Sequence, residues 1–274
     1  MTQSNITQMA PVTPKADKIG VTIKLKVFWK TTKFWTDANI VDYQKNVPNI
    51  AEQLRNTEYW NKDGDIEDNR FTCEDFAIRV LCQYASTKGL PVKLTTGVRR
   101  YGNMEIYNAQ THNRYGSNMQ GFTEMVMLTY GARDMQRVGR NTISVANPEE
   151  LLAGDILAQA LDAEGAALAI KNLQSVNVAH HIQLVYKNEG DQIHIFQGNS
   201  GSSIHWYASP FYKALGKNTA NPQDSAYGGK QVERGIYLKS NAIWNYANMD
   251  TGAKYDNKLK EFMLFRWDFK GFNK

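Results

Sequence analysis

Apolar residues along this chain follow a helical period in the first half and a strand-like alternation in much of the second half. The helical period is clearest over 73–88, where the apolar positions share one side with Cys73: Phe76, Ala77, Val80, Leu81 and Tyr84. Further helices are predicted over 48–55 and 118–137, and strands over 21–29, 92–98, 156–160, 181–187, 192–197, 235–238 and 261–269. A group of helices followed by a run of strands is typical of an α+β fold.

The helix over 73–88 has clear signals at both ends. Thr72 is a favoured N-cap residue, and Asp75 follows at the spacing of a capping box, in which each side chain bonds a backbone N–H near the other. Gly89 and Pro91 mark its end. Cys73 therefore takes the first helical position, where the helix dipole and the unpaired N–H groups favour a thiolate over a thiol. Because the thiolate is the nucleophilic form, Cys73 is the first candidate for covalent chemistry.

Composition and charge limit the class of protein. The 274 residues, 42% hydrophobic and 22% charged, suffice for one substantial core. Residues 1–18 are polar and predict a flexible tail, and 19–274 are expected to form a single domain with a helical insertion around 118–137 and a loop-rich C-terminal extension. The net charge of +5 is spread without a basic block, which argues against nucleic-acid binding. No transmembrane segment or signal peptide is found, so synthesis in the cytoplasm is expected.

Metal and disulfide chemistry have little support in the sequence. Cys73 and Cys82 are nine residues apart on one predicted helix and face opposite sides, which predicts two free thiols, the second of them buried. No His-Glu-x-x-His or paired-cysteine motif accompanies the histidines, so no metal and no cofactor is expected. The acidic residues of the polar loop over 61–70 are interpreted as solvated charges, not as a glycosidase pair.

A base for Cys73 is predicted from the two strands over 181–187 and 192–197. His181 opens the first strand, while Gln197 and Asn199 lie at the end of the second, beyond the turn over 188–191. An antiparallel hairpin would place His181 beside Gln197 or Asn199, whose amide oxygen can fix the imidazole tautomer as an Asn does in papain-type sites. The neighbouring His180 would point to the opposite face, so only one of the two histidines can serve.

These motifs in this order resemble the papain-like cysteine hydrolases of the NlpC/P60 and CHAP type, over residues 72–199. The matching elements are Cys73 at a helix start, Gly154-Asp155 before a strand, the strand led by His181, and Gln197-Gly198-Asn199 after the next. The resemblance implies a catalytic domain whose nucleophile helix packs on an antiparallel sheet, with Cys73 as nucleophile and His181 as base. The segment between Cys73 and His181 is longer than in compact members, and the third residue, Gln197 or Asn199, departs from the usual His or Glu.

By the same resemblance, the substrate is peptidoglycan and the reaction is amide cleavage in its stem peptides. A member without a signal peptide looks like an antibacterial effector of a type VI secretion apparatus, or a phage wall-degrading enzyme. The effector would act in the periplasm or cell wall of a target bacterium, and its partners would include the secretion apparatus and an immunity protein.

Two other classes of function remain open. Residues 73–77 also resemble bacterial transglutaminase-like cysteine proteinases, which would act on a protein by proteolysis or acyl transfer. That family needs an Asp after the His strand, whereas Asp191 lies at the turn. A non-enzymatic binding protein would instead use the aromatic-rich segment over 206–267, and would have no use for a reactive thiol.

Overall fold

The structure of the protein, a computed structural model, describes residues 23–57, 70–160, 179–198, 214–218, 220–224 and 226–274. The α-helices of this part are α1 Asp37–Thr57, α2 Cys73–Lys88, α3 Ala109–His112 and α4 Met119–Met127. Four short 3-10 helices accompany them: η1 Ala132–Gln136, η2 Pro148–Glu150, η3 Lys258–Glu261 and η4 Gly271–Asn273. None of the helices in these ranges combines the length and the apolar character needed to cross a bilayer.

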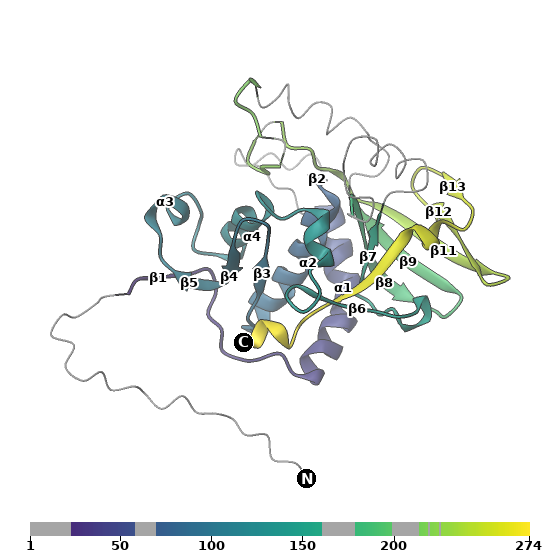
Figure 1. The fold of residues 1–274 in the computed structure, drawn as a ribbon, viewed down its shortest axis with the longest axis horizontal. Helices are drawn as coiled ribbons and strands as arrows, with labels where there is room; N and C mark the ends of the chain where they lie inside the picture. Colours follow the sequence, from purple (N-terminus) through teal and green to yellow (C-terminus); the bar gives the residue numbers. More distant parts are fainter. Residues whose placement is uncertain (1–22, 58–69, 161–178, 199–213, 219, 225) are drawn as a thin grey trace, which may run out of the picture.

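The main sheet has eight antiparallel strands in the order β13-β12-β11-β9-β8-β7-β14-β6 (Figure 1). Its strands are β6 Thr142–Ser144, β7 Ile156–Gln159, β8 His181–Asn188, β9 Gln192–Gln197, β11 Glu233–Ser240, β12 Ile243–Asn248, β13 Lys254–Tyr255 and β14 Phe262–Trp267. Short two-stranded ladders join β1 Leu25–Val27 to β5 Met104–Ile106, β2 Arg70–Phe71 to β10 Lys230–Gln231, and β3 Lys93–Thr95 to β4 Arg100–Gly102. The expected mixed fold with an antiparallel sheet is confirmed at this level.

Two apolar clusters lie on the two faces of the sheet. Helices α1 and α2 pack on one face, where the Phe76 ring of α2 contacts the Phe196 ring of β9 in the larger cluster, which also includes Ile182. The smaller cluster covers the other face and includes Val185, Tyr237 and Trp244. Alternation along the strands produces this division, because successive side chains point to opposite faces. Helix α2 is therefore held against β8.

The predicted limits of the helix over 73–88 are confirmed. The Thr72 hydroxyl oxygen accepts a hydrogen bond from the backbone N–H of Asp75 at 3.4 Å. At the other end, Gly89 adopts the left-handed conformation with φ of 67°. A side chain there would meet Thr32, so glycine serves both the turn and the packing.

The other predicted helices differ from the observed ones. The expected helix over 48–55 is the second half of α1, which runs through Pro48 because buried Tyr43, Val47 and Leu54 stabilise it on both sides of the proline. The expected helix over 118–137 divides into α4 and η1, with Gly131 between them. Its methionines Met125, Met127 and Met135 are buried in the same cluster as α2.

Several strands are shorter than predicted, and β12 was not predicted. Within the described residues the strand over 21–29 is reduced to β1, and that over 92–98 to β3. The turn between β11 and β12 has two consecutive residues with positive φ, Asn241 at 49° and Ala242 at 66°. This is the backbone of a tight hairpin turn, whose usual sequence signal is Asn-Gly, so the Asn-Ala pair concealed it.

We expect Ala242→Gly to stabilise the protein by about 0.5–1 kcal/mol, because glycine adopts positive φ without the steric cost that alanine bears. Ala247→Gly is the matched control, since Ala247 lies within β12 and its glycine variant should lose stability. Urea unfolding of the three proteins measures both effects. A loss of stability in both variants would contradict the strain at Ala242.

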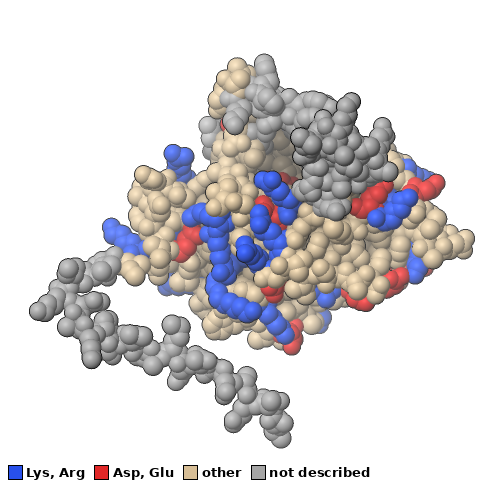
Figure 2. Space-filling model, viewed as in Figure 1, with Lys and Arg blue, Asp and Glu red and all other residues tan. Residues whose placement is uncertain are grey.

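Folding gathers the basic side chains more closely than their spacing in the sequence suggests. In Figure 2, Lys and Arg side chains form a band across the middle of one face. The chain carries 32 basic and 27 acidic residues, so this band arises from placement more than from the net charge. Such a band attracts anionic material to this face.

Candidate active site

Cys73 lies at the start of α2, beside the first residues of β8. Its side chain is buried, with 6% of its surface exposed. The thiol donates a hydrogen bond to Oε2 of Glu74 at 2.9 Å. The backbone N–H groups of Glu74 and Ile182 also interact with the sulfur. Ile182 directly follows His181 in the chain, so this backbone contact brings the thiol to the start of β8, where His181 lies.

Gly198 brings the end of β9 to the same place. A Cβ on Gly198 would lie 2.6 Å from the carbonyl oxygen of Phe71 and 2.8 Å from that of Thr72. Only glycine permits so close an approach of the two backbones. The end of β9 therefore lies directly against the residues that precede Cys73, so the helix start and the ends of two strands converge.

His181 is paired with Gln197, as the hairpin predicted. Its Nε2 lies 3.1 Å from Oε1 of Gln197. An amide oxygen only accepts hydrogen bonds, so Nε2 carries the proton and Nδ1 has the free lone pair. Burial lowers the pKa of His181 to about 4, which keeps the imidazole neutral at neutral pH. Asn199, the other candidate for this role, lies outside the described residues.

The Gln197 side chain is held by a buried polar network that was not predicted. Oε1 of Gln197 also accepts from Nε2 of Gln183 at 2.7 Å, and Nε2 of Gln197 donates to the Tyr246 hydroxyl at 2.7 Å. The Tyr237 hydroxyl in turn donates to Oε1 of Gln183 at 2.8 Å. These bonds fix which end of the Gln197 amide faces His181. Gln183 and Gln197 occupy alternating positions on two paired strands, and this pattern is the sequence signal that could have predicted the network.

The expected thiolate at Cys73 is corrected by its surroundings. Burial raises the pKa of the Cys73 thiol well above its usual value, and the adjacent Glu74 carboxylate raises it further. The two backbone N–H groups act in the opposite direction and are outweighed. Cys73 and His181 therefore rest as a neutral thiol and a neutral imidazole, and the helix start alone does not ionise the sulfur.

The predicted capping box is also modified, because Tyr227 stands between its two residues. The backbone N–H of Thr72 donates to the Tyr227 hydroxyl oxygen at 3.0 Å, and that hydroxyl donates to Oδ2 of Asp75 at 2.6 Å. Tyr227 lies 152 residues after Asp75 in the chain, so sequence spacing gave no sign of it. Burial, and then the charge of Glu74, raise the pKa of Asp75, so this carboxyl belongs to the support of the helix start.

The Gly154-Asp155 pair has a structural role separate from Cys73. Gly154 has a φ of 93°, and a Cβ there would lie 2.3 Å from the Tyr43 ring. The Asp155 carboxylate accepts two hydrogen bonds from Arg266 of β14, at 2.8 and 2.6 Å, and a third from the backbone N–H of Leu152. This bidentate pair fastens the start of β7 to β14.

The imidazoles of His112 and His194 contact Glu105 and Glu189, away from the Cys73 contacts. His180 is exposed and precedes β8, while His194 contacts Glu189 at 3.1 Å. Cys82 is a fully buried free thiol, as predicted. Among the residues that the structure describes, no group of three His, Cys, Asp or Glu side chains is placed to hold a metal ion.

We expect Glu74→Gln to lower the pKa of the Cys73 thiol, because it removes a buried negative charge from the thiol's hydrogen-bond partner. The rate of alkylation by iodoacetamide, followed against pH with Cys73 identified by peptide mass, measures this. Glu189→Gln is the control, because Glu189 contacts Lys187 and His194 on the surface. An unchanged pH dependence in Glu74→Gln would show that burial alone sets the thiol pKa.

Comparison of the chain with protein-family models, with curated proteins and with solved structures finds no match. The function must therefore be argued from the site itself: a cysteine at a helix start, a neutral histidine on the neighbouring strand, and a glutamine that holds the imidazole.

Proposed function

We propose that the protein is a cysteine hydrolase of papain-like arrangement that cleaves amide bonds, with Cys73 as nucleophile, His181 as base and Gln197 as the residue that orients the base. The observation that carries this proposal is the hydrogen bond from Nε2 of His181 to Gln197, at the start of the strand whose Ile182 backbone contacts the Cys73 thiol. A nucleophile, a base and a group that orients the base are the three parts that such catalysis requires.

The reaction would begin from the neutral pair. Nδ1 of His181 accepts the thiol proton of Cys73 as the sulfur attacks the amide carbonyl, which gives a tetrahedral oxyanion. Backbone N–H groups at the start of α2 stabilise that charge. The protonated imidazole then gives its proton to the leaving amine, and water hydrolyses the thioester with His181 again as base. For this sequence to start, the thiol must leave the Glu74 carboxylate and turn to the imidazole.

Peptidoglycan stem peptides are the proposed substrate. This choice rests on the likeness of the Cys73, Gly154-Asp155, His181 and Gln197 order to the NlpC/P60 and CHAP hydrolases. The band of basic side chains in Figure 2 supports attraction to anionic cell-wall material. By the same likeness, the protein would be an antibacterial effector or phage-type enzyme acting in the periplasm or cell wall, with an immunity protein as partner of an effector.

Incubation of the protein with purified peptidoglycan sacculi, followed by mass analysis of the soluble products, tests the proposal. New stem-peptide fragments, with one bond cleaved, would support it and identify the bond. A parallel incubation with casein and with an amine donor separates the protein-directed classes. Casein fragments or amine incorporation, with sacculi left intact, would assign the site to a proteinase or an acyltransferase instead.

A further inference from the structure

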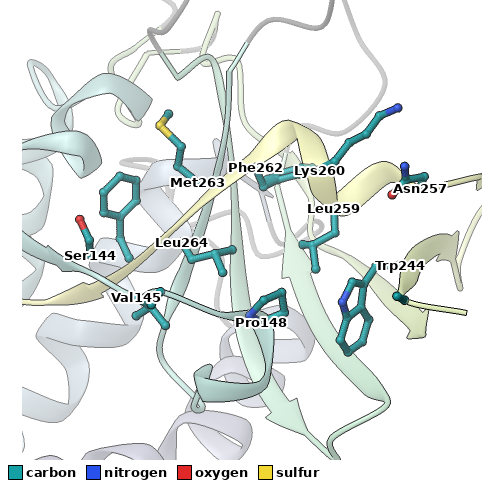
Figure 3. A pocket seen from close by; sticks show the side chains of 13 residues that line it. Ser144, Val145, Pro148, Trp244, Asn257, Leu259, Lys260, Phe262, Met263 and Leu264 are labelled. Carbon is teal, nitrogen blue, oxygen red and sulfur yellow. The ribbon is translucent and has the colours of Figure 1, made fainter. Parts of the chain in front are cut away.

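A groove lies at the edge of the main sheet. The residues that line it are not those that contact Cys73. Its volume is about 520 Å³. It runs between β14 and the chain that leaves β6, and is closed by η3 and β12 (Figure 3). The lining is mostly apolar: Val145, Ala146, Pro148, Ala242, Trp244, Leu259, Phe262, Met263, Leu264 and Phe265, with Ser144, Asn257 and Lys260 as its polar members.

One wall of the groove is a strand edge that is only partly paired. The ladder between β6 and β14 covers Phe265 to Trp267 and no further, whereas β7 pairs with β14 from Phe262 onward. Beyond this ladder, Val145 donates its N–H to the carbonyl oxygen of Leu264 at 2.9 Å, and the chain then turns away into η2. That bond places the Leu264 backbone on the groove side of β14. By the alternation of the ladder, the N–H of Leu264 and the C=O of Phe262 face the groove, and no strand among the described residues pairs with them.

Apolar side chains line the base of the groove beside this edge, and a charged side chain lies at its border. Trp244, Leu259 and Phe262 are buried at the base, and Val145 and Leu264 are half-buried above them. Figure 3 shows Trp244, Leu259 and Leu264 pointing toward the same space, with Lys260 at the border.

Lys260 differs from the lysines around it. Lys258 is paired with Glu261 and Lys239 with Glu149, both at 2.5 Å, whereas the described residues provide no carboxylate partner for exposed Lys260. An exposed cation beside an apolar groove favours a ligand that carries both apolar groups and a negative charge.

We propose that this groove binds an extended peptide segment of a partner protein, which adds to β14 as a strand and bears an acidic side chain opposite Lys260. The open N–H and C=O groups supply the backbone bonds, and the apolar floor accepts alternate side chains of the added strand. This site does not depend on the proposed hydrolase activity, because the groove shares no residue with Cys73, His181 or Gln197.

Fluorescence anisotropy with a labelled eight-residue peptide tests the proposal. The probe alternates valine with threonine and ends in two glutamates; one comparison peptide ends in two lysines, and another carries N-methyl groups on alternate backbone amides. We expect the acidic peptide to bind at least about tenfold more tightly than either comparison peptide. Ala146→Trp, which fills the groove from an exposed position, should weaken binding about tenfold or more, and Lys260→Glu should reverse the preference between the two charged peptides.

Two control variants distinguish peptide binding in this groove from binding elsewhere on the protein. Val98→Trp changes an exposed position that does not line the groove, and Cys73→Ala changes the catalytic candidate, so both should bind the peptide like the wild type. Absence of binding, or binding unaffected by backbone methylation and by Ala146→Trp, overturns the proposal. If the free protein self-associates in sedimentation and Ala146→Trp abolishes that association, the occupant is a second copy of this chain and the partner peptide is rejected.

Discussion

Cys73→Ala protein is expected to release no stem-peptide fragments from sacculi, with a loss of activity of about 10⁴-fold or more. Removal of the nucleophile leaves no group that can form the covalent intermediate, and losses of this size are typical when a catalytic nucleophile is removed. The substitution deletes a single buried sulfur atom at the start of α2, so the thermal unfolding temperature should change little. Product release measured by mass, together with thermal unfolding, distinguishes loss of chemistry from loss of fold.

Cys82→Ala is the matched control for this experiment. Both cysteines are free thiols on α2. Cys82 is fully buried and lies nine residues further along the helix than Cys73. Cys82→Ala should therefore keep its activity even if it loses some stability through a small cavity. Activity retained in Cys73→Ala would exclude Cys73 as nucleophile and with it the proposed mechanism.

The parts of the site that could be predicted from the sequence are those set by local patterns. Thr72 and Gly89 bound α2 because capping and the left-handed turn depend on residue types at fixed spacing. His181 meets Gln197 because two alternating strands joined by a short turn have few possible registers. The mixed fold with an antiparallel sheet is predicted by the helical and strand-like spacing of apolar residues along the chain.

The parts that could not be predicted depend on residues far apart in the chain. Tyr227 enters the capping box from a distant segment, and Arg266 fixes Asp155 across paired strands. The thiol pKa depends on burial and on the rotamer of Glu74, which no helix-dipole argument contains. The groove beside β14 arises because β6 is shorter than β14, a difference that appears only when the two strands are paired.

His181→Ala should reduce hydrolysis nearly as much as Cys73→Ala, whereas His180→Ala should retain it. Only His181 is bonded to Gln197 and adjacent to the residue that contacts the thiol; His180 is exposed and lies before β8. Added imidazole should partly restore activity to His181→Ala, because a small base can occupy the space of the lost ring, and a purely structural histidine would not be rescued in this way. Equal losses in the two variants, without rescue, would contradict the assignment of His181 as base.

The pH dependence gives an independent test of the same residue. Burial lowers the pKa of His181 from 6.5 to about 4, so the base is neutral above this lower value, and the acid limb of kcat/KM should lie near pH 4. Between these two values the unfolded chain binds more protons than the folded protein, so stability should fall as the pH falls through this window. His181→Ala should lose this part of the pH dependence, which urea unfolding at several pH values measures. An acid limb near pH 6.5, with the same stability profile in wild type and variant, would mean that water reaches the imidazole freely and that the neutral pair is not the resting state.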